Sequence, residues 1–155
     1  MSLEAVIEYF SEYDMDHRVI VSKHSTATVE EAAQEHNVDP DQIGKTLSFK
    51  VDETPILIVV AGVAKIDNKK YKSHFFKKAK MLNKDEVLAY TGHAIGGVCP
   101  FGLKKQIDVY LDVSLKKHSE VIPAAGDRNS SIRLTIDELE KYSNCKEWVD
   151  VCKYD

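Results

Sequence analysis

KTLSFKVDETPILIVVA, residues 45–61, is the segment of the chain that decides its fold. Within it, residues 46–51 alternate between polar and apolar side chains, which is typical of a strand with one buried face. Residues 56–61 are all apolar, which predicts a strand buried on both faces. Residues 52–55 (DETP) between them have the composition of a turn. The segment therefore predicts a β-hairpin.

Outside this segment, helices and further strands alternate along the chain. Helical spacing of apolar residues or a capping box predicts helices over 3–13, 28–37 and 83–90 and from Thr135 onward. Residues 67–80 are expected to form one or two short basic helices. Further strands are predicted at 19–21, 107–113, 121–125 and 132–134. This interleaving predicts the α+β class with a mixed sheet.

The chain has the length and composition of one globular domain. It has 155 residues, of which 43% are hydrophobic and 30% charged, and this balance excludes a disordered chain. We expect a single domain over residues 1–155 that acts as a monomer. The longest apolar run, residues 56–61, is far too short to cross a bilayer, and no targeting segment is evident, so a cytoplasmic protein without membrane partners is predicted.

Several common chemistries have no signature in the sequence. The three cysteines lack C-x-x-C spacing, and the six histidines lack the spacing of metal ligands, so neither a disulfide framework nor a metal site is predicted. No phosphate-binding loop, dinucleotide fingerprint or nucleophile elbow is present, and no cofactor is expected.

Charge is distributed unevenly along the chain. The net charge is −4, but residues 42–118 carry fourteen basic and seven acidic side chains. The excess peaks in KIDNKKYKSHFFKKAK, residues 65–80, with seven lysines and one aspartate. Such a segment is either a solvated helix face or a surface that binds phosphates.

Three segments join polar or glycine-rich sequence to predicted strands. In residues 42–49, Lys45 stands at the mouth of an apolar strand, where it either serves a site or extends to solvent. Residues 96–102 (GGVCPFG) form a tight turn or a loop whose N–H groups bind an oxyanion, and His93 lies just before it. Residues 123–134 form a hydrophilic hairpin loop or one wall of a pocket.

The order of these motifs resembles a known family. K-T-L at 45–47, G-G-V-C-P-F-G at 96–102, V-Y-L-D at 109–112 and A-A-G-D-R-N-S-S-I-R-L at 124–134 are similar to the YbaK/prolyl-tRNA-synthetase-associated editing domain, over residues 20–140. The resemblance implies a mixed, partly barrel-like sheet flanked by helices. It also implies a trans-acting enzyme that hydrolyses the ester between a wrong, small amino acid and its tRNA. Mischarged tRNA is then the substrate, and an aminoacyl-tRNA synthetase is a candidate partner.

The resemblance and the residue patterns together nominate the site. Lys45 and Gly97 are the predicted catalytic residues. The predicted substrate-binding residues are His93, Gly96, Val98, Cys99, Pro100, Ala124, Ala125, Gly126 and Ser131. The basic segment supplies the predicted tRNA-binding residues Lys65, Lys69, Lys70 and Lys72. The chain departs from many family members at Cys99, where serine is common, and at Ala124, Ala125 and Ser131, which leaves the edited amino acid open among alanine, cysteine, serine and proline.

The sequence leaves more than one mechanism open. As an ammonium, Lys45 would orient the ester, whereas a neutral Lys45 acting as a base would need deep burial. Cys99 is an alternative nucleophile if His93 serves as its base. A ribose hydroxyl of the substrate is a third source of proton transfer. A non-catalytic module that binds tRNA or a synthetase, and an esterase for small molecules, are the competing functions.

Overall fold

The hairpin predicted from residues 45–61 forms the centre of the structure. The computed structural model describes residues 2–155, and in it β2 (Ile43–Val51) pairs antiparallel with β3 (Thr54–Ala61). Asp52 and Glu53 make the turn with φ angles of 48° and 69°. Two left-handed residues in a two-residue turn match the twist of the paired strands. The predicted hairpin is confirmed, and β2 begins three residues earlier than expected.

Six strands form the main sheet, in the order β8-β6-β2-β3-β5-β9. β2 runs parallel to β6, β3 parallel to β5, and β5 parallel to β9, whereas β6 and β8 are antiparallel. The strands beside the central hairpin are β5 (Asp108–Asp112), β6 (Glu120–Pro123), β8 (Leu134–Thr135) and β9 (Glu147–Val149). The predicted mixed sheet is confirmed.

Two short ribbons extend this sheet. β1 (Val19–Val21) pairs with β7 (Ser130–Ile132), and a bridge between Ala124 and Ser131 links β7 to the end of β6. The sheet thus curls round toward β1, which confirms its partly barrel-like form. The second ribbon joins β4 (Lys65–Ile66) to β10 (Cys152–Lys153).

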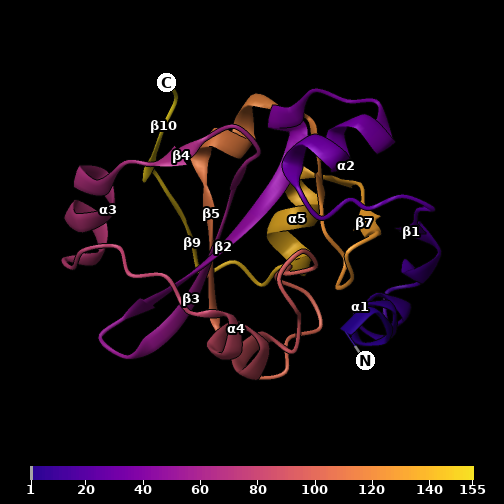
Figure 1. Ribbon diagram of the computed structural model, residues 1–155, viewed down its shortest axis with the longest axis horizontal. Coiled ribbons are helices and arrows are strands. Elements are labelled where there is room, and N and C mark those ends of the chain that lie inside the picture. The colour runs from indigo at the N-terminus through magenta and orange to yellow at the C-terminus, as the bar shows by residue number, and fades with distance from the viewer. Residues whose placement is uncertain (1) are drawn as a thin grey trace.

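Five α-helices surround the sheet (Figure 1). Their bounds are Ser2–Ser11 for α1, Val29–His36 for α2, Asn68–Phe75 for α3, Lys84–Thr91 for α4 and Ile136–Tyr142 for α5. Single 3-10 turns lie at Asp16–Arg18, Pro40–Gln42 and Val113–Lys117. The three predicted capping boxes are present at Thr28, Asn83 and Thr135. The basic segment forms one helix, α3, followed by an extended stretch.

The core lies on both faces of β3. Residues 57–61 of this strand have no accessible surface, as its uniformly apolar sequence predicts. On one side Tyr71 of α3 packs against Phe49, with ring centroids 5.2 Å apart, and elsewhere Phe10 of α1 packs against Phe101 at 4.8 Å. Across residues 2–155, no helix is both long and apolar enough to cross a membrane.

The remaining differences from prediction lie in short strands. The predicted strand over 132–134 is divided at Arg133, because β7 ends at Ile132 on its pairing with β1 and β8 begins at Leu134 on its pairing with β6. The carbonyl oxygen of Arg133 accepts a hydrogen bond from Arg18 at 2.8 Å. β4, β9 and β10 were not predicted at all. Strands of two or three residues are too short to show the alternation of polar and apolar side chains that predicts a strand. They form because they pair with segments that are distant in the sequence.

Candidate active site

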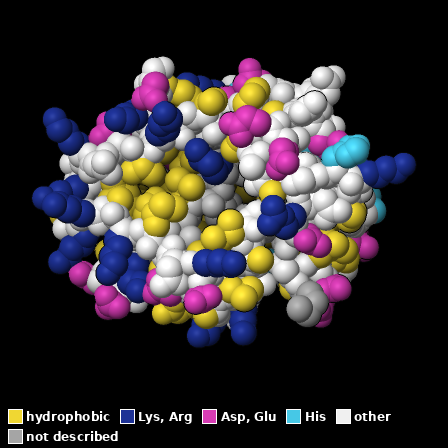
Figure 2. Space-filling model, in the orientation of Figure 1, with side chains coloured by type: hydrophobic (Ala, Val, Ile, Leu, Met, Phe, Trp, Pro, Cys, Tyr) yellow, Lys and Arg dark blue, Asp and Glu magenta, His cyan; other side chains and the backbone are white. Residues whose placement is uncertain are grey.

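A cavity of about 220 Å³ opens between the start of β2 and three loops. Figure 2 shows it as a hollow near the middle of the viewed face. Its walls come from residues 43–48 of β2, residues 26–29 with Ala32 around the start of α2, Ile95, Gly96 and Val98 of the glycine-rich loop, Ile122, Ala124 and Ser131 of the curled edge, and Met81. The hairpin and all three polar segments predicted from the sequence contribute to it.

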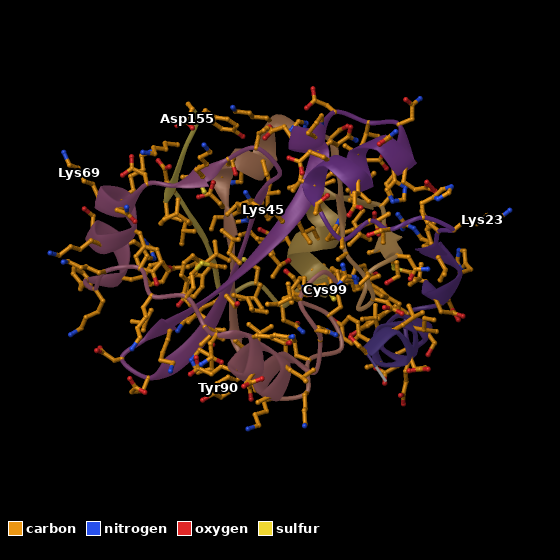
Figure 3. The ribbon with its side chains drawn as sticks, in the orientation of Figure 1. Lys23, Lys45, Lys69, Tyr90, Cys99 and Asp155 are labelled. Atoms are coloured by element: carbon orange, nitrogen blue, oxygen red, sulfur yellow. The ribbon has the colours of Figure 1, made fainter. Side chains whose placement is uncertain are left out.

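Lys45 is the one titratable side chain in this wall among residues 2–155. It lies half-buried on β2 opposite Val60, and Figure 3 shows it near the centre of the molecule. Its Nζ donates to the carbonyl oxygen of Ala64 at 2.9 Å. Burial lowers the pKa of Lys45, while the carboxylates of Glu30 and Asp41 oppose that shift. An ammonium has three N–H donors, so two remain for a ligand.

The rest of the wall combines small apolar side chains with hydroxyl groups. Thr26, Ser48 and Ser131 line the cavity, and the Ser131 hydroxyl donates weakly to Thr26 Oγ1 at 3.5 Å. The Thr46 hydroxyl is buried and has no hydrogen-bond partner among residues 2–155. Buried hydroxyls normally have partners, so Thr46 is an exception, but its oxygen has almost no accessible surface and does not face the open cavity. The pocket therefore suits a small ligand with both apolar and polar parts.

The glycine-rich loop is held against the loop that follows β6. The Gly126 N–H donates to Gly97 O at 3.0 Å, and Gly97 N–H donates to Ala94 O. A Cβ on Gly97 would lie 2.6 Å from the backbone of Gly126 and Asp127, so only glycine permits this approach. Gly97 itself does not line the cavity.

Its neighbours Gly96 and Val98 do line the cavity, and Gly96 adopts a φ of 102°. Among residues 2–155, neither of their N–H groups has a protein acceptor. These two donors are therefore candidates to bind an oxyanion. Arg128, whose exposed side chain lies beside Gly96, also reaches this rim.

Cys99 and His93 lie beneath the loop instead of in the cavity. Both are fully buried, and the cysteine Sγ lies 3.6 Å from Nε2 of the histidine. That imidazole also contacts the carbonyl oxygen of Phe101 at 2.7 Å and the hydroxyl of Ser2. Burial raises the pKa of Cys99 to about 12 and lowers that of His93. A buried thiol with a raised pKa is a poor nucleophile, so the pair supports the loop from below.

Some of the other predicted residues line the cavity, and the rest lie outside its wall. Of the predicted substrate-binding set, Gly96, Val98, Ala124 and Ser131 line the cavity with Lys45. Pro100 lies at a second cavity beside Tyr9, and Ala125 and Gly126 are buried behind the wall. Sequence reasoning assigned no role to Thr46, which lies inside the K-T-L motif, or to Ile95, which precedes the glycine-rich motif, although both line the cavity. No group of three metal-ligating side chains occurs within residues 2–155.

The predicted tRNA-binding lysines lie on α3 or, for Lys65, on β4 just before it, and none of them lines the cavity. Figure 3 shows Lys69 far from Lys45. Lys65 pairs with Asp155, and Lys70 pairs with Asp150 at 3.1 Å. Lys69 and Lys72 have no ion pair among residues 2–155 and line a separate groove with Lys78. Figure 2 shows that basic side chains gather at this end of the same face as the hollow.

Comparison with known proteins identifies the family of this chain. The family described as "Aminoacyl-tRNA editing domain" matches residues 23–142. Protein YwhH of Bacillus subtilis (strain 168) is 51% identical over 154 residues, which cover 99% of this chain and 98% of that protein. A candidate Cys-tRNA(Pro)/Cys-tRNA(Cys) deacylase, EbsC of Enterococcus faecalis (strain ATCC 700802 / V583), is 32% identical over 76% of this chain and 73% of its own length.

A solved structure gives the same result. The crystal structure of a candidate trans-editing enzyme for prolyl-tRNA synthetase superposes with a TM-score of 0.88 at 29% identity. The superposition covers 98% of this chain and 97% of that one. The predicted family is thus confirmed, and with it aminoacyl-tRNA editing as the class of function. The chain belongs to the aminoacyl-tRNA editing domain family.

Proposed function

We propose that the protein is a free-standing deacylase that hydrolyses the ester between a small, wrongly attached amino acid and tRNA. The observation that carries this proposal is the position of Lys45 as the one titratable side chain lining a cavity of about 220 Å³ within residues 2–155. Pockets for drug-sized ligands start at about 300 Å³, so this one suits a small aminoacyl group. A size sieve of this kind removes the amino acids that a synthetase fails to reject.

The geometry favours Lys45 as an orienting cation. Its ammonium is fixed by Ala64 O at 2.9 Å, which leaves two N–H donors for the ester carbonyl or the terminal ribose. Because the side chain is only half-buried and Glu30 and Asp41 favour the charged form, we assign the ammonium form to it. Holding the ester against a fixed donor lowers the barrier through orientation and charge stabilisation.

The remaining steps are assigned to the loop and to the substrate. The N–H groups of Gly96 and Val98 would stabilise the oxyanion that forms when water adds to the ester carbonyl. No carboxylate, imidazole or thiol lines the cavity among residues 2–155. We therefore assign the proton transfer to a ribose hydroxyl of the substrate and not to Cys99 or His93.

The names of the relatives suggest which substrates to test first. EbsC is described as acting on Cys-tRNA(Pro) and Cys-tRNA(Cys), and the solved relative serves prolyl-tRNA synthetase. We propose that tRNA(Pro) carrying cysteine or alanine belongs to the substrate range. A prolyl-tRNA synthetase would then be the natural partner, because its errors create these molecules.

A panel of mischarged tRNAs tests the proposal. The purified protein is incubated with tRNA(Pro) carrying alanine, cysteine or serine and with correctly charged tRNAs, and loss of the ester is measured against a blank. We expect rapid loss of one or two small amino acids from the mischarged species only. No hydrolysis of any species would indicate a binding module, and hydrolysis of simple esters without preference for tRNA would indicate a small-molecule esterase.

Lys45→Ala should lower kcat/KM on the preferred species by at least about tenfold, equal to about 1.4 kcal/mol of transition-state stabilisation. Lys45→Arg keeps the charge and should retain more activity than the alanine variant. Lys23→Ala is the matched control, since this exposed lysine lies at the edge of the molecule, away from Lys45 (Figure 3). A folded Lys45→Ala variant with unchanged turnover would remove Lys45 from the site.

Gly97→Ala should separate the two loops that form the cavity wall. Its new Cβ would stand 2.6 Å from Asp127 N and from Gly126 C, so the free energy of unfolding should fall by about 1–3 kcal/mol. Deacylation should fall as well, because Gly96 and Val98 move with the loop. Gly44→Ala is the control for stability. The distance from its new Cβ to Pro123 would be 3.4 Å, which is an ordinary van der Waals contact. If urea denaturation shows equal losses for both variants, the loop contact has no special role.

A further inference from the structure

Phe76 stands out because its backbone and its side chain are both in unfavourable settings. It ends α3 with a φ of 64°, and the residue is 80% exposed. Bulky residues rarely adopt the left-handed conformation, and glycine or asparagine normally occupies such a helix end. Two other helices of this chain follow that rule, with Asn37 after α2 and Gly92 after α4. Within residues 2–155, Phe76 does not belong to the hydrophobic core.

Near Phe76 in the chain, three lysines of the described residues have no ion-pair partner. Lys69, Lys72 and Lys78 line a groove of about 470 Å³ with Asn68 and Ala79. Within residues 2–155 no carboxylate lies within 4.0 Å of these three ammonium groups. Their neighbours differ, since Lys65, Lys70 and Lys77 are each paired with an aspartate. The groove is therefore suited to bind anions from outside the chain.

A short stretch of chain leads from this groove to the candidate active site. Lys78 lines the groove, and Met81, three residues later, lines the cavity and lies opposite Phe49 of β2. The stretch between them lies along β2, because Lys50 N donates to Lys80 O at 2.8 Å and Leu82 N donates to Ser48 O at 3.1 Å. Three extended residues span about 11 Å at most, and stacked nucleotides rise about 3.4 Å each. The groove therefore lies within about three nucleotides of the cavity.

We propose that Phe76 stacks on an unpaired base near the 3′ end of the tRNA, while Lys69, Lys72 and Lys78 bind the adjoining phosphates. The proposal rests on the proposed function, since an aminoacyl ester in the cavity places the single-stranded end of the tRNA beside this groove. Aromatic rings next to lysines are the usual platform for single-stranded RNA. This role would account for a phenylalanine at an unfavourable left-handed position, because its exposed side chain is available to a base. A protein partner would also cover the ring, but three unpaired lysines favour the phosphates of the substrate.

The test measures RNA binding separately from hydrolysis. The probe is an uncharged, fluorescently labelled oligoribonucleotide with the single-stranded sequence of a tRNA 3′ end, and its Kd is measured by anisotropy at two salt concentrations. Phe76→Ala should raise Kd by about five- to tenfold, and Phe76→Trp should keep wild-type affinity. Leu88→Ala, at an exposed position of α4, is the control and should change nothing. Failure of the wild-type protein to bind, or equal binding by Phe76→Ala, would overturn the proposal.

Phe76→Gly separates stacking from a structural role. Glycine tolerates the left-handed conformation, so this variant should melt about 2–4 °C higher than wild type while binding RNA as weakly as Phe76→Ala. A lower melting temperature would show that the ring supports the fold and would overturn the assignment. Loss of synthetase binding with unchanged RNA affinity would instead identify a protein-docking residue and also overturn it.

The two proposals fail in different ways. RNA binding that depends on Phe76, without hydrolysis of any mischarged tRNA, would refute the deacylase and leave the stacking platform in place. Hydrolysis of mischarged tRNA with no effect of Phe76→Ala on RNA affinity would refute the stacking platform alone.

Discussion

The hydrogen bond from Lys45 to the carbonyl oxygen of Ala64 is the interaction on which the site depends. It fixes an ammonium at the edge of a strand pair whose second strand is buried on both faces. Ala64 belongs to the turn after β3, and that turn is itself held firmly. A Cβ on Gly62 would lie 1.9 Å from Pro40 O, so only glycine lets the turn approach the 3-10 segment beside it. The position of the Lys45 ammonium is thus set by backbone packing that a side chain at residue 62 would break.

Asp41 extends this support to the C-terminal end of the chain. Its backbone and side-chain oxygens accept from Gly62 N and Val63 N, and its carboxylate also contacts His118 at 2.9 Å and Tyr154 at 3.0 Å. β10 pairs with β4 just before Tyr154. These C-terminal residues lie beyond the matched family region, 23–142, yet they pack beside the turn that holds Lys45. The cation therefore sits at a junction of three segments that are distant in the sequence.

The sequence predicted correctly those features that depend on interactions between residues close together in the chain. The alternation of residues 46–51, the apolar run of 56–61 and the three capping boxes each reflect interactions within a few residues, and the structure contains all of them. The position of Lys45 followed from the strand on which it stands. Features fixed by distant contacts could not be read in this way. The burial of Cys99 depends on packing beneath a loop, and β4 exists only because β10 pairs with it. Neither the left-handed backbone of Phe76 nor its exposure is revealed by any periodicity of the sequence.

The central claim is that the aminoacyl end of tRNA binds in the cavity beside Lys45. Backbone amide chemical shifts, recorded by NMR during titration with an aminoacyl-adenosine analogue whose ester is replaced by an amide, test this claim most directly. The account predicts that the largest shifts fall on Lys45, Thr46, Gly96, Val98 and Ser131, which line one wall or another of the same cavity. Shifts centred instead on Tyr9, Pro100 and Leu103, at the second cavity, would contradict it.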